Sequence, residues 1–288
     1  MGKREALLSI ARRQFHAQLL GSVLTIDGNG VPSNADKASK QSVAIAKGII
    51  ERIGAHTAAD RLAGQRSGSQ FEEICCSYIN TTFHSLTHLR PGRWTVSKGV
   101  GGGRMGISRF EQYSHLDALA ELAGTNPDLA AALGSDYLIK PDVVIYREPE
   151  PDEVFNADKL QVSDKEALLT GLRAHNSTLP ILHASISCKW TLRSDRAQNA
   201  RSEGLNLVRN RKGRLPHITV ITGEPTPNRI ASIALGTGDI DHVYHFALYE
   251  LVDTVKALGL GDYEESLATM IDGKRLRDIS DLPLDLIV

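Results

Sequence analysis

Apolar residues spaced three and four positions apart predict helices along the first half of the chain. The expected ranges are 4–20, a helix that starts near Asp36 or Ser39 within 33–54, and Ser69 to about Leu86. Two more helices are expected within 111–124 and 126–134, and Asn126 followed by Pro127 is typical of a helix start. The pattern therefore predicts a mainly helical first half.

Short β-branched runs bounded by proline or glycine predict three strands further along. They are Val143–Tyr146, a strand within 179–190 and a strand within 215–224. In the second of these, alternation puts Ser185, Ser187 and Lys189 on one face. We therefore expect Lys189 to point, with two serines, toward a polar surface.

The order of these elements predicts the fold class. A helix from about Ser194 to Lys212, ended by Gly213, separates the last two strands, and later helices are expected over 241–258 and 262–272. Strands interleaved with helices predict an α/β fold in which a central mixed sheet is flanked by helices on both sides. No repeat or linker is evident in the 288 residues, so we expect one domain over 1–288.

Composition narrows the class of protein. Hydrophobic residues make up 41% of the chain, enough for a packed core, and no run of about 18 apolar residues predicts a membrane span. The charged N-terminal segment predicts a helix and not a signal peptide. Cys75 and Cys76 are adjacent and Cys188 is isolated, which fits reduced thiols in the cytoplasm. Neither CxxC nor HExxH spacing occurs, so a zinc site is not expected.

The net charge of −1 conceals an uneven distribution. From Arg193 to Arg214 there are seven basic and two acidic residues, whereas from Glu148 to Glu166 there are seven acidic and two basic residues. A basic stripe on a nearly neutral body fits a cleft for a polyanion. Taken alone, the same run also fits a solvated helix face.

Three residues carry candidate chemistry: Asp142 before a strand, Lys189 near the end of another, and Glu203 in the helix that follows. If that helix packs back across the strand end, the three side chains come close together. Two carboxylates can hold Mg²⁺, and a lysine can stabilise charge on a phosphate or position the attacking water. Each residue also fits an ordinary role, as a turn residue, a snorkelling lysine or a surface glutamate.

Together, Pro141-Asp142, Ser187-Cys188-Lys189 and Glu203 resemble the permuted active site of the PD-(D/E)xK nucleases. Ser187 stands where the common arrangement has an acidic residue, which Glu203 would replace from a helix. The segments 185–218 and 224–241 resemble type II restriction endonucleases that cut sites with a CCGG core, and the similarity covers nearly the whole chain except 147–175. The resemblance implies a restriction endonuclease-like fold and Mg²⁺-dependent, site-specific cleavage of DNA.

The resemblance also implies roles for single residues. Asp142 and Glu203 would bind metal together with the main-chain carbonyl of Cys188, and Lys189 would be catalytic. Glu72, or its neighbour Glu73, would be a further acidic residue near the metals. Two Mg²⁺ ions per active site and an in-line displacement that leaves 5′-phosphate and 3′-hydroxyl ends are implied.

Arg193, Asp195 and Arg196 are expected at the start of the helix after the strand. Arginine can contact O6 and N7 of guanine, and aspartate can accept from N4 of cytosine, each pair giving about 1–3 kcal/mol of discrimination. The resemblance implies that these residues read the CCGG core. Without it, Arg-Ser-Asp-Arg also fits a capped helix start with surface arginines.

For the outer base pair the resemblance indicates Asp36 and Arg229, and it indicates Gln65 as a minor-groove contact. The implied site is GCCGGC, cut after the first G to leave four-base 5′ overhangs. A palindrome requires two-fold symmetry of the protein. The resemblance further implies a homotetramer, a dimer of dimers, that binds two copies of double-stranded DNA.

Two other functions fit parts of the pattern. One is a nuclease of the same fold that acts in DNA repair or junction resolution, and the other is a DNA-binding protein without catalysis. The intact Arg-Ser-Asp-Arg segment disfavours the first, because structure-selective binding does not need a base reader. A lysine between two carboxylates disfavours the second.

Overall fold

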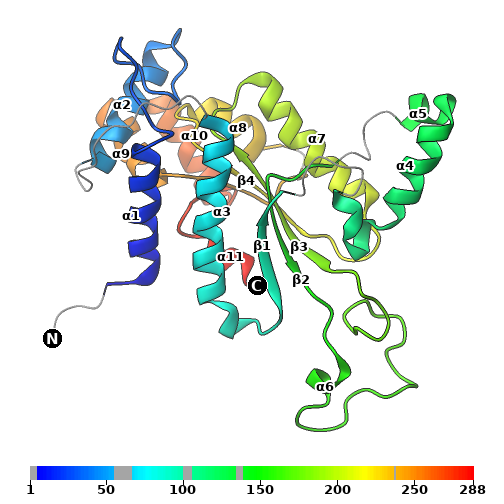
Figure 1. Cartoon of the computed structure of the whole chain (residues 1–288). Coiled ribbons are helices and arrows are strands. Elements are labelled where there is room, and N and C mark those ends of the chain that lie inside the picture. The colour runs from blue at the N-terminus through cyan, green and yellow to red at the C-terminus, as the bar shows by residue number, and fades with distance from the viewer. Residues whose placement is uncertain (1–4, 55–66, 100–105, 134–138, 237) are drawn as a thin grey trace.

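A six-stranded mixed sheet lies at the centre of the computed structural model, which describes residues 5–54, 67–99, 106–133, 139–236 and 238–288 (Figure 1). The spatial order of the strands follows the sequence: β1 (Trp94–Lys98), β2 (Val143–Arg147), β3 (Ile181–Lys189), β4 (His217–Thr222), β5 (His242–His245) and β6 (Leu276–Asp278). Strands β1 to β3 pair antiparallel, whereas β3 to β6 pair parallel.

Helices supply the crossovers that the parallel strands require. α7 (Ser194–Asn210) joins β3 to β4, α8 (Pro227–Ala234) joins β4 to β5, and α9 (Leu248–Ala257) with α10 (Gly261–Asp272) joins β5 to β6. The parallel register pairs Lys189 with Thr222, and Thr222 with His245. The ends of three strands therefore meet at one edge, where the candidate residues lie.

The remaining helices cover the two faces of the sheet. α1 (Leu7–Leu20) packs on α3 (Ser67–Ser85), which crosses β1 to β3, and α2 (Lys40–Gly54) packs on α9 (Figure 1). Short helices and turns of 107–133, among them α4 (His115–Thr125) and α5 (Pro127–Leu133), lie with α7 toward the opposite face. None of the helices in the described ranges is long and apolar enough to cross a membrane.

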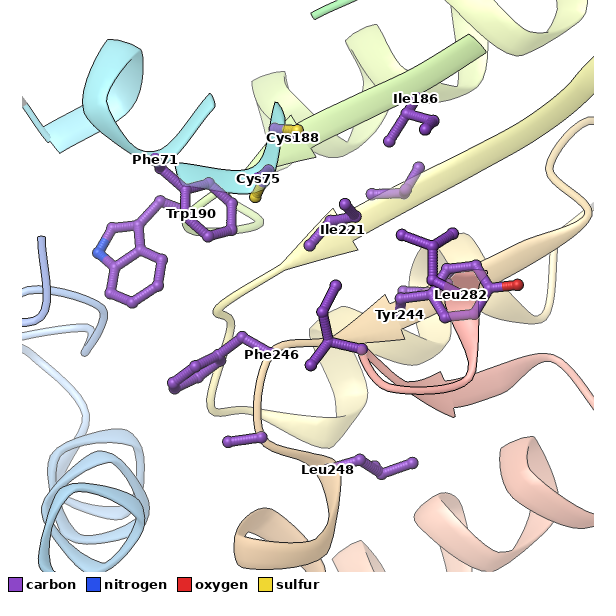
Figure 2. Packing of buried hydrophobic residues seen from close by; sticks show 14 of the residues in the cluster. Phe71, Cys75, Ile186, Cys188, Trp190, Ile221, Tyr244, Phe246, Leu248 and Leu282 are labelled. Carbon is purple, nitrogen blue, oxygen red and sulfur yellow. The ribbon is translucent and has the colours of Figure 1, made fainter. Parts of the chain in front are cut away.

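Alternation along the strands divides the core between the two faces. Val143 and Ile145 belong to the larger apolar cluster, and Val144 belongs to a smaller one with residues of α4 and α7. In Figure 2, Cys75 of α3 lies close to Cys188 of β3, and Trp190 lies beside Phe71. The Trp190 ring is 5.0 Å from that of Phe71 and 5.4 Å from that of Phe246, so the chain that leaves β3 is fixed by aromatic packing.

Most predicted elements are present, and one prediction is wrong. The residues expected to form a single helix over 241–258 form β5 and then α9, because the four residues of β5 pair with β4 and are nearly all buried. Among the described residues, several further elements were not foreseen, including β1, α6 (Asp152–Phe155), α8, β6 and α11 (Leu282–Leu286). Gly213 has the expected left-handed φ of 85°, but α7 already ends at Asn210.

The connection between β2 and β3, residues 148–180, projects from the body and is named here the β2–β3 arm (Figure 1). It contains α6 (Asp152–Phe155). Arg173, only 1% exposed, holds it together: its guanidinium pairs with Asp152 at 2.5 Å and donates to the carbonyls of Ser163 and Glu166. A side chain thus organises a segment that has little regular structure of its own.

Candidate active site

The start of β2 and the end of β3 bring Asp142 and Lys189 together, because the two strands are antiparallel. The ammonium Nζ of Lys189 lies 2.8 Å from Oδ2 of Asp142. The main-chain N–H of Cys188 donates to the same oxygen at 2.7 Å. Asp142 is therefore fixed by the backbone of β3 as well as by the lysine.

Glu203 approaches the same point from α7. Its Oε2 accepts a hydrogen bond from the hydroxyl of Ser187 at 3.2 Å, and that hydroxyl is 3.5 Å from Oδ2 of Asp142. Ser187 is 8% exposed, so the face it shares with Lys189 is largely buried and not the polar surface that the alternation had suggested. The two carboxylates converge on the position of this serine hydroxyl.

Burial and neighbouring charges shift the pKa values of Glu203 and Lys189. Burial raises the pKa of Glu203; Lys189 lowers it and Asp142 raises it further. Burial disfavours the Lys189 ammonium, but Asp142 and Glu203 outweigh that effect and raise the lysine's pKa. Lys189 is therefore a cation at neutral pH, and a further cation near Glu203 would favour the ionised form of that carboxyl group.

Glu72 of α3 faces this cluster. Burial and the charge of Asp142 raise its pKa, whereas Lys98 and Lys189 lower it. The neighbouring Glu73 pairs instead with Lys98 at 2.9 Å and is exposed. Of the two glutamates considered from the sequence, Glu72 is the one in electrostatic contact with Asp142.

The donor chemistry fits Mg²⁺. Among the described residues, no group of three or more His, Cys, Asp or Glu side chains is arranged to hold a metal ion. Mg²⁺ does not require one, since it is held by one or two carboxylates and completes its shell with waters and substrate phosphates. Asp142 and Glu203 are two carboxylates that could hold such an ion.

The thiol of Cys188 does not fit a nucleophile. The adjacent Cys75 thiol and complete burial raise its pKa well above the usual value. A protonated, buried thiol is unreactive. The contribution of Cys188 to the site is its main chain, and its side chain packs in the core.

The expected base readers lie beside this cluster. Arg193 is the N-cap residue of α7, and Asp195 and Arg196 are in its first turn; all three are exposed. An open hollow of about 710 Å³ is lined by Arg193, Arg201 and other residues of α7 and α8. Its basic lining suits the phosphates and guanines of a DNA duplex.

The candidates for the outer base pair lie in the same hollow. Asp36 and Arg229 both line it and form an ion pair, although 193 positions separate them in the sequence. The N–H of Ala38 and the guanidinium of Arg229 lower the pKa of Asp36. The structure thus places the inner candidate Arg193 and both outer candidates on one hollow, which Asp195 and Arg196 do not line. Gln65 lies outside the described residues.

Sequence reasoning gave no role to two residues of this region. Ser187 had been treated as a vacated acidic position, but its hydroxyl lies between the two carboxylates. Glu224, which follows β4 in a proline-rich turn, has the sequence context of a surface residue, yet it is fully buried. A glutamate directly after a buried strand was the available signal for the second residue.

Two sequence comparisons and one structural comparison relate the chain to known proteins. A family model described as NgoMIV restriction enzyme matches residues 15–288. The type II restriction enzyme NgoMIV of Neisseria gonorrhoeae is 54% identical over 283 residues, covering 98% of this chain and 99% of that protein. A structure of the restriction endonuclease PspGI with substrate DNA matches 97% of this chain and 90% of that chain, with 12% identity and a TM-score of 0.26. A TM-score of this size does not establish a shared fold.

Proposed function

Since the chain belongs to the family of NgoMIV restriction enzymes, we propose that it cleaves double-stranded DNA at the palindrome GCCGGC by Mg²⁺-dependent hydrolysis. Membership of the family makes it a type II, site-specific restriction endonuclease. The observation that carries the finer proposal is the meeting of Asp142, Lys189 and Glu203 beside the hollow lined by Arg193 and Arg229.

Asp142 and Glu203 would hold Mg²⁺ together with the Cys188 carbonyl, and the ion would polarise the scissile phosphate and acidify the attacking water. Lys189, kept cationic by Asp142, stabilises the negative charge that develops on the phosphate or orients that water. The Ser187 hydroxyl keeps Glu203 in place. Glu72 is the candidate ligand for a second ion, since the charge of Asp142 raises its pKa.

Base reading is divided between two groups of side chains. Arg193, Asp195 and Arg196 would read the CCGG core, because guanidinium and carboxylate groups match the major-groove edges of guanine and cytosine. Arg229 and Asp36 would read the outer G·C pair by the same chemistry. Arg193, Asp36 and Arg229 line one hollow, which supports a single hexameric site.

A digest in Mg²⁺ buffer tests this assignment. A plasmid with mapped GCCGGC sites should give fragments that end at those sites, and run-off sequencing should show a cut after the first G with four-base 5′ overhangs and 5′-phosphates. Fragments that follow a different hexamer would reject the site while leaving the nuclease assignment intact.

We also propose that the protein acts as a homotetramer, a dimer of dimers that binds two DNA copies. The β2–β3 arm supports this, because Leu160 and Leu169 on it are 79% and 98% exposed. Single exposed leucines are common, but two on an arm that Arg173 holds in shape suit a surface covered by another subunit. The site of action would be the cytoplasm.

The two rival functions predict different behaviour. A repair or resolution nuclease would prefer branched or damaged DNA to a GCCGGC duplex. A binder without catalysis would show no Mg²⁺-dependent cleavage. Comparing cleavage of a GCCGGC duplex, a four-way junction and a duplex without the site separates all three.

A further inference from the structure

The buried Glu224 joins the two groups of base readers. It is 0% exposed, and its carboxylate accepts the main-chain N–H of Leu192 at 2.9 Å and that of Thr226 at 3.2 Å. Leu192 directly precedes Arg193, and Thr226 is the N-cap residue of α8, which carries Arg229. One carboxylate therefore accepts hydrogen bonds from the backbone next to Arg193 and from the backbone at the start of the helix that carries Arg229.

The same carboxylate also lies near the outer reader itself. Nη1 of Arg229 is 3.8 Å from Oε2 of Glu224, while Nη2 pairs with Asp36. Arg229 thus lies between a buried carboxylate and one that borders the hollow. A buried charge is costly without partners, so a glutamate at this position constrains each group that compensates it.

The main chain around Glu224 leads on to the catalytic lysine. The N–H of Glu224 donates to Oγ1 of Thr222 at 3.2 Å, and the Thr222 hydroxyl donates to the carbonyl of Lys189 at 2.8 Å. The carbonyl of Gly223 accepts from Nδ2 of Asn34, two residues before Asp36, at 2.8 Å. Residues 222–226 therefore contact the segments that carry the inner reader, the outer reader and Lys189.

Glycine at position 223 is required for this close approach. A Cβ built on Gly223 would lie 2.4 Å from the Trp190 ring and 3.0 Å from the Trp190 carbonyl. The connection after β4 therefore packs directly on the chain that leaves β3. This close packing leaves little room for the strand that carries Lys189 to move relative to the base readers.

We propose that Glu224 is a positioning residue that fixes the inner and outer base readers relative to each other and, through Thr222, relative to Lys189. The inference rests on the proposed function. Glu224 contacts no solvent and no base. It holds the start of α7 and the start of α8 at a fixed distance and orientation. A wrong outer base pair therefore also displaces Arg193 and Lys189.

The test is a ratio of single-turnover cleavage rates on a GCCGGC duplex and on an ACCGGT duplex, which differ in the outer pair. Glu224→Gln keeps the size of the side chain but removes the charge beside Arg229, and it should lower this ratio about tenfold, since a hydrogen bond to a charged group contributes about that much. The ratio is independent of the fraction of active protein, so a loss of folded protein alone cannot change it.

Glu150→Gln is the matched control, because Glu150 is a carboxylate that is 3% exposed, near Arg93 and Arg147 and away from the readers. It should keep the wild-type ratio. Should Glu224→Gln not fold, Thr222→Val tests the link from Glu224 to Lys189 and Thr222→Ser restores it. The first should lower the rate on GCCGGC about tenfold per folded protein, and the second should not.

The rate ratio of the wild-type protein separates this inference from the proposed function. If the wild-type protein does not prefer GCCGGC, the proposed site is wrong, and the same outer-pair comparison is then made on the hexamer found by run-off sequencing. If the wild-type protein discriminates and Glu224→Gln discriminates equally well, the positioning role is wrong and the proposed function stands.

Discussion

The two ends of strand β3 differ in how their charged side chains are compensated. Before its start, Arg173 of the β2–β3 arm is 1% exposed and is bonded to Asp152 and to backbone carbonyls. At its end, Glu203 is partly buried with a raised pKa and accepts a hydrogen bond from the Ser187 hydroxyl. A charge compensated within the chain thus stabilises a shape, whereas a partly buried carboxylate with a raised pKa retains the capacity to bind a cation.

Removing the ammonium group of Lys189 should give the largest effect. Lys189→Ala should lower cleavage of GCCGGC about a thousandfold or more, because charge on the phosphate loses its stabilising ammonium. Specific binding in Ca²⁺ should remain near the wild-type level. Lys256→Ala, an exposed lysine of α9, serves as the control and should cleave normally. Cleavage at the wild-type rate by Lys189→Ala would show that the active site lies elsewhere.

Removing an inner reader should affect binding and not only cleavage. Arg193→Ala should weaken binding to GCCGGC by roughly tenfold to a hundredfold in Ca²⁺, since a bidentate contact to guanine contributes about 1–3 kcal/mol. Binding to unrelated DNA should change far less. Arg13→Ala, an exposed arginine of α1, is the matched control in the same fluorescence anisotropy titration. Equal losses on specific and unrelated DNA would assign Arg193 to the phosphate backbone instead.

The proposed tetramer is tested through the exposed leucines of the β2–β3 arm. Leu160→Ser with Leu169→Ser should convert a tetramer into dimers, because both side chains are largely exposed in the single chain and would be buried between subunits. Sedimentation equilibrium measures the mass. Plasmids with one and two sites should be cut at different rates by the wild-type protein and at similar rates by the variant. A wild-type protein that is already dimeric would contradict the tetramer.

The smallest expected effect is the change in protein stability when the charge of Glu203 is removed from the active site. The pKa of Glu203 is raised in the folded chain, so its ionised form destabilises the metal-free protein above that pKa and the penalty disappears as the pH falls through it. Glu203→Gln should therefore raise the melting temperature at neutral pH without metal by about 2–4 °C while cleavage is lost. Mg²⁺ should stabilise the wild-type protein more than the variant. A lower melting temperature for Glu203→Gln would contradict this account.

The sequence predicted the parts of the fold that carry a clear period. The helix over 194–210 and the buried strand ending at Lys189 follow from apolar spacing, and so does the position of Arg193 at a helix start. Strand β6 has three residues, too few for a period to emerge, and the five residues of the edge strand β1 are all partly buried with no alternation. The run 241–258 combined a four-residue strand with a helix, and its apolar residues fit either period until pairing with β4 selects the strand.

The sequence singled out the residues that the structure brings together, but not the contacts between them. Alternation could place Lys189 on a face, but only the antiparallel register of β2 and β3 brings Asp142 to it. The roles of Ser187 and Glu224 depend on tertiary hydrogen bonds that no local pattern encodes. The arm was unpredictable for the same reason, since Arg173 shapes it by binding backbone carbonyls.

The central claim is that Asp142 and Glu203 share one cation next to Lys189 and the scissile phosphate. Anomalous diffraction from a crystal of the DNA-bound protein grown with Mn²⁺ tests it directly. The account predicts an anomalous peak bonded to both carboxylates and to a phosphate oxygen at the first G of the site. An ordered Mn²⁺ bound by other residues, with Asp142 and Glu203 free of metal, would contradict it.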